Sequence, residues 1–316
     1  MLVRLLGGVE VAAADGWTRA GPPKRACVLA ALALSPGAPV SLGDLIRRVW
    51  GDDPPESAVT VLYGHMTWLR TLLRDCADMS IRRSTGGGYL LEIDAEQIDL
   101  YAARSLAKRA RRQSETGRHG LSVSLWRQVC DLARGEALAG VSGDWAAEVR
   151  AGFRREHLSM LAERFDAELA AGQHAAVVGE LAELAARHPA DESMTGRLMT
   201  ALYRCGRPAE ALDAFSQIRQ RLADELGVDP SDQLRKLHLR ILQQDPGLEH
   251  VEDETDAGPF ADEQREADAA PPVPAELPAD AAGFAGRDAQ VEQLCVQAAG
   301  NGVLVVDGMA GVGKTA

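Results

Sequence analysis

The stretch from Glu56 to Ile93, ESAVTVLYGHMTWLRTLLRDCADMSIRRSTGGGYLLEI, joins a helical pattern to a glycine-centred hairpin. Its apolar residues recur every three or four positions: Ala58, Leu62, Met66, Leu69 and Leu73. That spacing predicts one helix from Glu56 to about Asp75 with a single buried stripe. From Ile81 to Ile93, Gly86-Gly87-Gly88 separates a short basic strand from an apolar one, which predicts a hairpin.

The opposite face of the predicted helix is polar and partly basic. It holds Thr60, Tyr63, Thr67, Trp68, Arg70, Thr71 and Arg74. Hydroxyls and arginines are the groups that bind base edges and phosphates. The hairpin begins with Arg82, Arg83, Ser84 and Thr85, which suits a wing against a phosphate backbone or minor groove. Either feature alone is also consistent with an ordinary solvated helix face or an exposed turn. Their order favours DNA binding.

The residues before this stretch complete a small α+β domain. Residues 2–11 alternate loosely and predict strand, and residues 24–34 predict a helix. Ser41 is the expected cap of a second helix, with Asp44 three positions later. The order is therefore sheet, three helices and hairpin. We place the DNA-binding domain at residues 1–94.

The net charge of −12 is concentrated outside this domain. Residues 245–282 hold twelve acids and one base, Arg265, so this stretch carries −11 of the total. The acidity therefore does not argue against DNA, and any DNA contact must come from local clusters of basic residues. The stretch is rich in Pro and Ala and poor in large apolar residues, which predicts a disordered linker.

Residues 98–244 predict an all-helical domain with an internal repeat. Gly172 and Gly206 lie 34 positions apart. Four further pairs share that offset: Ala175 with Ala209, Val178 with Leu212, Leu181 with Phe215, and Leu184 with Ile218. A period of 34 residues is the tetratricopeptide spacing, in which small residues lie where helices approach and large ones fill the core. A chance match between alanine-rich helices is the alternative.

The last segment, residues 283–316, contains a complete phosphate-binding loop sequence after an apolar strand. Its defining residues are Gly308, Gly311, Gly313, Lys314 and Thr315. In such a loop the backbone amides wrap phosphates, the lysine reaches the outer phosphates and the threonine holds magnesium. The following helix and the second magnesium ligand are absent, so we expect a non-enzymatic chain that does not hydrolyse ATP. We expect no cofactor in this chain, although a longer protein would bind ATP and magnesium.

The spacing of the cysteines and the hydropathy of the sequence indicate in which cellular compartment we expect the protein. The five cysteines are widely separated, without a C-x-x-C pair, so neither a zinc site nor a disulfide framework is expected. The sequence has no apolar run of about 18 residues. We expect a reduced, cytoplasmic protein with no membrane partner and no metal site.

Residues 1–245 resemble a known family. The run from Leu2 to Ile93 resembles the OmpR/PhoB-type winged helix. The runs GRLMTALYRCGRPAEAL at residues 196–212 and LADELGVDP at residues 222–230 resemble the bacterial transcriptional activation domain. Together they resemble the Streptomyces antibiotic regulatory protein (SARP) family. Residues 284–287 and the phosphate-binding loop resemble the start of an NB-ARC-type NTPase module, as in the large AfsR-like members.

This resemblance implies a mainly α protein that activates transcription. It implies binding to direct promoter repeats near the −35 element, as a homodimer on double-stranded DNA, and recruitment of RNA polymerase through its sigma factor. The regulated genes would be secondary-metabolite clusters. By position, Thr60, Thr67, Trp68 and Arg70 fall where the family reads the major groove, and Ser84, Gly88 and Tyr89 fall in its wing. The family often has a basic residue where Trp68 stands, so Trp68 either packs on a thymine methyl or sugar, or is buried.

Two functions from other classes remain open. One is a signalling P-loop NTPase of the STAND type whose N-terminal region is a protein-interaction platform. The other is a tetratricopeptide adaptor that uses its winged helix for protein contact. Both predict no sequence-specific DNA binding by residues 1–245.

Overall fold

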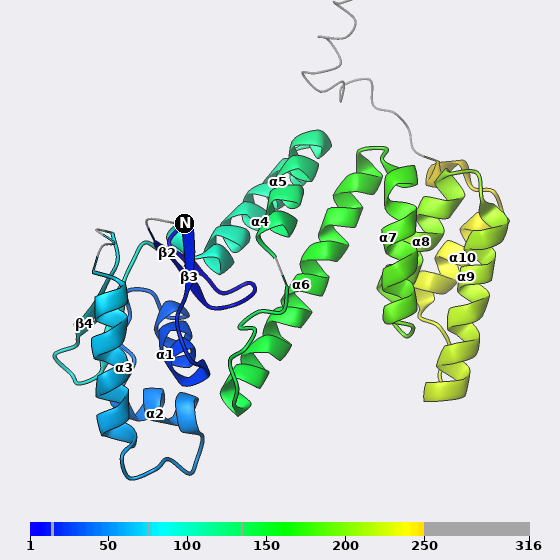
Figure 1. Cartoon of the computed structure of the whole chain (residues 1–316). Helices are drawn as coiled ribbons and strands as arrows, with labels where there is room; N and C mark the ends of the chain where they lie inside the picture. The colour runs from blue at the N-terminus through cyan, green and yellow to red at the C-terminus, as the bar shows by residue number, and fades with distance from the viewer. Residues whose placement is uncertain (14–15, 75, 77, 134, 250–316) are drawn as a thin grey trace, which may run out of the picture. The chain divides into compact units, whose positions relative to one another are not determined.

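The computed structural model describes residues 1–249, apart from 14–15, 75, 77 and 134. The expected phosphate-binding loop and residues 250–282 of the expected linker lie outside the described residues. The described part has an N-terminal α+β domain followed by an all-helical domain, as the sequence predicts (Figure 1). In this part, no helix has both the length and the apolar character needed to cross a membrane.

The N-terminal domain packs three helices between two small antiparallel sheets. The elements are β1 (Val3–Arg4), β2 (Glu10–Ala13), β3 (Gly16–Arg19), α1 (Pro23–Ala33), α2 (Leu42–Trp50), α3 (Ala58–Leu72), β4 (Ser80–Arg83) and β5 (Tyr89–Glu92). β1, β2 and β3 form one sheet, whereas β4 and β5 form the hairpin. For the first sheet the sequence predicts a single strand region, residues 2–11, and not β3, because the β3 residues GWTR lack apolar alternation.

Local chemistry sets the ends of these helices. Pro23 stands in the first turn of α1, where its missing N–H costs nothing. The Ser41 hydroxyl accepts the Asp44 backbone N–H at 3.0 Å and caps α2, as predicted. α3 begins at Ala58 rather than Glu56, because Pro55 and Glu56 lie in the turn that leads to Ser57 at its N-cap. The helix is therefore slightly shorter than the sequence suggests.

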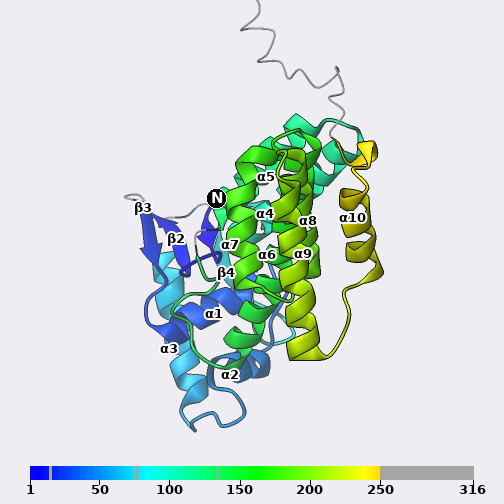
Figure 2. The same ribbon diagram turned by 90° about the vertical axis from the view of Figure 1, so that its right-hand side faces the viewer.

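The helical domain is built mainly from antiparallel neighbours. Its elements are η1 (Ala95–Gln97), α4 (Asp99–Glu115), α5 (His119–Leu132), α6 (Asp144–Ala170), α7 (His174–Arg187), α8 (Glu192–Arg204), α9 (Pro208–Arg221), the π-helical turn η2 (Leu222–Leu226), α10 (Asp232–Leu242) and η3 (Pro246–Leu248). Figure 1 shows the long α6 between the α4–α5 pair and α7–α10. Figure 2 shows α7, α8 and α9 side by side, and α8 packs on both its neighbours.

The 34-residue repeat corresponds to real helices. α7 shifted by 34 positions coincides with α9, and the last half of α6 coincides with α8. Gly172 and Gly206 occupy the intervening turns with φ of +74° and +71°, a conformation that favours glycine. Leu181, Leu184, Phe215 and Ile218 are buried as predicted.

Two details of that prediction are wrong. Ala175 and Ala209 are exposed in the first turns of α7 and α9 instead of lying between helices, and Ala211 is the small buried residue. Leu212, expected in the core, is only half-buried at its edge. The repeat gives the period correctly, but the face that each small residue occupies depends on the crossing of neighbouring helices.

The helical domain continues beyond Asp245, where we expected the linker to begin. Leu248 is buried in the core of α6–α10, and its carbonyl accepts the Arg204 Nε–H at 2.9 Å. Asp245 pairs with Arg240 at 2.6 Å and caps η3. These contacts hold the chain against α8 and α10 as far as Leu248.

The two domains share one hydrophobic core. Ile98, Leu100, Leu138, Val141 and Ala146 of the helical domain belong to the same buried cluster as the winged-helix core. The Leu138 and Ala139 N–H groups donate to the carbonyls of Leu5 and Gly7 at 2.9 and 2.8 Å. The connection between the domains is therefore a packed seam.

Candidate nucleic-acid interface

Helix α3 has one buried face, as its apolar spacing predicts. Ala58, Leu62, Met66, Leu69 and Leu73 are each at most 3% exposed. They seat the helix on the core that α1 and α2 complete. The opposite face is consequently turned to solvent, and the polar residues singled out in the sequence lie on it or beside it.

Most of the predicted contact residues on α3 are exposed. Thr60, Tyr63, Thr67, Arg70 and Arg74 all face solvent. The Thr67 hydroxyl donates to the Tyr63 carbonyl at 3.0 Å, which leaves its oxygen as an acceptor toward an outside donor. The face therefore offers hydroxyls and guanidinium groups, which suits both base edges and phosphates.

Val59 and Val61 add an apolar component to this surface that was not predicted. Val59, Val61 and Tyr63 are among the exposed large hydrophobic residues, at 38%, 37% and 41% exposure. Val59 and Tyr63 are four positions apart on one side of the helix. Apolar side chains in a major groove contact thymine methyl groups. The signal was present in the sequence as Val59 and Val61 beside the polar face, but valines there also fit a buried flank.

Trp68 is a packing residue in part. It is half-buried against the winged-helix core, and the Arg25 guanidinium of α1 lies 4.0 Å from its ring centroid. Of the two roles left open for Trp68, the structure favours burial. Arg25 supplies a positive charge beside it. Sequence reasoning could not find Arg25, because it lies on another helix 43 positions earlier.

Arg70 joins α3 to the hairpin. Its Nε–H donates to the Ile81 carbonyl at 3.1 Å, and its guanidinium lies 5.5 Å from the Tyr89 ring centroid. Arg70 thus positions the hairpin while its exposed end remains available to an anion. The sequence suggested a base-reading or phosphate-binding role and gave no sign of this second one.

The hairpin presents some, though not all, of its predicted contacts to solvent. Arg82, Arg83 and Thr85 are exposed, and Ser84 is half-buried at the turn. Arg82 also pairs with Glu92 on β5 at 2.6 Å, so part of its charge is compensated. Tyr89, expected in the wing, is buried beneath Arg70.

Gly88 fixes the hairpin to the domain. Its φ is +102°, and a Cβ there would lie 2.2 Å from the Val40 carbonyl oxygen. The Tyr89 N–H donates to that oxygen at 2.9 Å, and the Val40 N–H donates to the Tyr89 carbonyl at 2.8 Å. Close backbone approach therefore requires glycine at this position. Val40, which precedes α2, is bonded to β5, and Arg70 of α3 is bonded to β4. These two contacts hold the hairpin in place.

The phosphate-binding residues Gly308, Gly311, Gly313, Lys314 and Thr315 lie outside the described residues. Their role stays a prediction from the sequence.

Comparison with known protein families identifies both domains. Residues 20–91 match the family model "Transcriptional regulatory protein, C terminal", and residues 98–242 match "Bacterial transcriptional activator domain". The helices and the hairpin of the winged helix fall in the first match, and α4–α10 fall in the second.

Several characterised proteins are similar over most of the chain. Regulatory protein AfsR of Streptomyces coelicolor is 39% identical over 95% of this chain, which spans 30% of that relative. Regulatory protein DnrI of Streptomyces peucetius is 36% identical over 70% of this chain and 85% of its own length. The structure of Mycobacterium tuberculosis EmbR, in complex with a low-affinity phosphopeptide, matches with a TM-score of 0.73 and 27% identity, covering 77% of this chain and 65% of that one.

Proposed function

Because the chain belongs to the Streptomyces antibiotic regulatory protein family of DNA-binding transcriptional regulators, we propose that it is a cytoplasmic, non-enzymatic activator of secondary-metabolite genes. Its winged helix would bind direct repeats near a promoter −35 element. Its helical domain would join two protomers on DNA and recruit RNA polymerase through the sigma factor. The observation that carries the proposal is one exposed surface formed by α3 and the arginine-bearing hairpin.

The chemistry of this surface supports readout of duplex DNA. A helix fits the major groove, where guanidinium and hydroxyl groups distinguish base pairs. The Arg70–Ile81 contact holds β4, which carries the exposed Arg83, against α3, so both elements can meet one duplex. Phosphate contacts of this kind set register and affinity.

The activating role is supported by the second domain. Residues 98–242 match the bacterial transcriptional activator domain, and the relatives are named as regulatory proteins or transcriptional regulators. The packed seam with the winged helix gives this domain a defined position relative to bound DNA.

A binding experiment tests the DNA-reading surface. A bound sequence would be selected from a random duplex library, and affinities measured by fluorescence anisotropy at several salt concentrations. We expect Arg70→Ala to weaken specific binding by about 1–3 kcal/mol, as the loss of a base-contacting arginine does. Arg83→Ala should weaken binding to all sequences alike and reduce the salt slope by about 1, as loss of a phosphate contact does.

Arg109→Ala provides the matched control, because Arg109 is exposed on α4 and its loss changes the net charge equally. It should leave affinity and salt slope unchanged. If no sequence is enriched, or if all three variants behave like the unsubstituted protein, the surface does not bind DNA. The rival signalling NTPase with an N-terminal interaction platform would then be favoured.

A further inference from the structure

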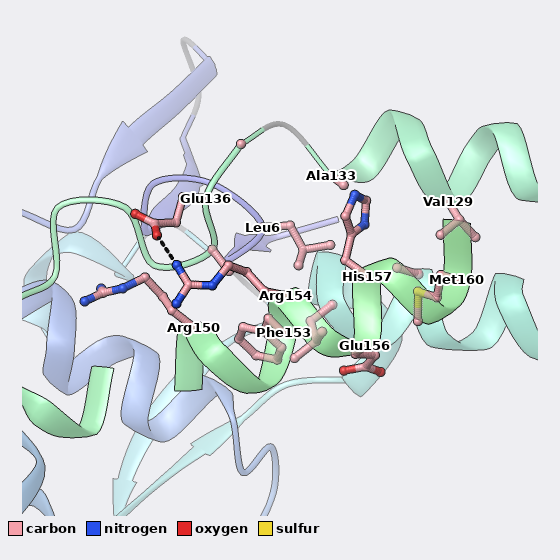
Figure 3. Close-up of a pocket in the computed structure, with 14 residues that line it drawn as sticks. Leu6, Val129, Ala133, Glu136, Arg150, Phe153, Arg154, Glu156, His157 and Met160 are labelled. Carbon is pink, nitrogen blue, oxygen red and sulfur yellow. Dashed lines mark hydrogen bonds and ion pairs between the residues drawn. The ribbon is translucent and has the colours of Figure 1, made fainter. Parts of the chain in front are cut away.

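A cavity of about 290 Å³ lies at the seam between the two domains. Leu6, from the segment between β1 and β2, forms one wall, and the other walls come from α4, α5, α6 and the loop residues 133 and 135–137. Figure 3 shows Leu6 facing Val129, His157 and Met160 across this space, with Phe153 at one side.

The lining of this cavity is typical of a ligand site. It is largely apolar, with Leu6, Leu100, Ala103, Val129, Phe153 and Met160 among its residues. Protein interiors are close-packed, and voids larger than a water molecule are few. Small-molecule pockets have volumes from about 300 to 1,000 Å³ and combine an apolar lining with a few placed polar groups. The seam cavity stands at the small end of that range.

The charged groups at its rim already have polar partners within the protein. Glu136 contacts Arg154 at 3.2 Å, and Glu156 accepts two bonds from Arg104, each of 2.7 Å. Arg150 donates to the carbonyl of Val141 at 2.7 Å, which holds the neighbouring loop in place. Both rim carboxylates are therefore paired with arginines, and the Arg150 guanidinium is bonded to the backbone, so none of these groups is left without a polar partner for an occupant to satisfy.

His157 supplies the polar group of the site. It stands at the mouth, exposed on one side, with its ring between Leu6 and Ala133 (Figure 3). Partial burial lowers the pKa of His157, and Arg164 lowers it further. Its imidazole is therefore neutral near pH 7, with one nitrogen that donates and one that accepts a hydrogen bond.

We propose that the seam cavity binds a compact, largely apolar, uncharged small molecule whose hydroxyl or carbonyl group hydrogen-bonds to His157. A bicyclic aromatic ketone or phenol has this chemistry. Such a molecule would touch Leu6 of the winged helix and Met160 of the helical domain at once. The inference goes beyond the proposed function, and its test uses no DNA.

Prodan, a neutral naphthalene ketone with environment-sensitive fluorescence, is a suitable probe. We expect saturable binding of one Prodan per full-length chain in a fluorescence titration, and a matching stoichiometry by calorimetry. In a protein with ¹³C-labelled methionine methyl groups, Prodan should shift the Met160 resonance. The resonances of Met194 and Met199, buried in the α6–α10 core, should not move. This measurement needs no substitution, so it cannot fail through misfolding.

Two substitutions add a matched comparison. Ala133→Phe places a ring in the mouth of the cavity and should reduce Prodan affinity by at least about tenfold. Ala209→Phe adds the same ring on the exposed face of α9 and should leave the affinity unchanged. The proposal is overturned if Prodan leaves the Met160 resonance in place, or if both variants bind Prodan as the unsubstituted protein does.

Discussion

Asp99 makes side-chain hydrogen bonds across the seam between the two domains. It is 2% exposed, and its carboxylate accepts the N–H groups of Leu5, Leu6 and Leu100 at 2.8–2.9 Å. Leu5 and Leu6 follow β1, whereas Asp99 opens α4. One side chain thus ties the first strand of the winged helix to the first helix of the helical domain.

Asp99→Asn should destabilise the protein by about 1.5–3 kcal/mol, the range for a hydrogen bond to a charged group. The amide would turn a donor toward backbone N–H groups that need an acceptor. Urea denaturation measures the loss, and hydrogen exchange should show faster exchange at Leu5 and Leu6. Asp213→Asn, at an exposed site on α9, is the control. Equal stability of the two variants would contradict the role given to Asp99.

His65 on α3 makes the winged helix sensitive to acid. Burial lowers the pKa of His65, and Arg25 and Lys24 lower it further. As pH falls through the ordinary histidine value of about 6.5, the unfolded chain takes up a proton before the folded one does. The contribution of His65 to stability is therefore present above that pH and is lost below it.

We expect the unfolding free energy to fall less between about pH 7.5 and about pH 5.5 in His65→Gln than in the unsubstituted protein. Paired urea titrations at the two pH values measure this difference. An identical pH dependence in both proteins would show that His65 titrates alike in the folded and unfolded states.

For single residues, the sequence predicts which side chains are exposed better than it predicts which residues they contact. The exposed Thr60, Thr67 and Arg74 follow from helical periodicity alone, because they oppose a regular apolar stripe. The Arg25–Trp68 and Arg70–Ile81 contacts do not, because each joins elements whose relative positions depend on the tertiary fold.

Among the elements, the repeat of α7 and α9 shows how far a period can be read from sequence. Its turn glycines and most of its large core residues are correctly predicted, Leu212 excepted, because helix packing requires them at fixed spacing. The contacts between the repeat and α10 are not predicted. Phe215 of α9 stacks on His238 of α10, with ring centroids 3.9 Å apart, and none of the five repeated pairs includes a residue of α10.

Phe215→Ala should cost about 3–5 kcal/mol of stability, as large truncations in a core do. Phe215 is 4% exposed, and its removal would leave a cavity between α9 and α10. Gln217→Ala, two positions along on the exposed face of α9, should cost little. Denaturant melts of both variants provide the measurement. A loss below about 1 kcal/mol for Phe215→Ala would mean that the helices close over the gap.

At the scale of the whole described molecule, the hydrophobic core of the winged helix extends across the domain boundary that the sequence indicates. A winged helix ending at Asp94 would lack Leu138, Val141 and Ala146, together with the Asp99 carboxylate. Each buried side chain of leucine or valine size contributes about 1.5–3 kcal/mol. The sequence could not reveal this, because helices α1 to α5 separate Leu138 from Leu5 and Gly7 along the chain.

We therefore expect residues 1–94 alone to unfold at a lower temperature than residues 1–249, and the longer chain to unfold in one cooperative transition. Differential scanning calorimetry compares the two. Residues 1–249 are preferred over a chain ending at Gln244, because Leu248 belongs to the core. The same midpoint for both fragments would mean that the seam adds no stability.

The Leu5 and Gly7 carbonyls accept hydrogen bonds from the Leu138 and Ala139 amides. These bonds between the domains limit where two related proteins can be recombined, both in the laboratory and in evolution. A hybrid regulator that takes its winged helix from one parent and its helical domain from another would normally be spliced between residues 94 and 98. Such a splice would separate residues 5–7 from the partners they meet at positions 99 and 138–141. Working hybrids should need those short segments transferred together, and natural exchange of the front half between homologues should carry compensating changes at the same positions.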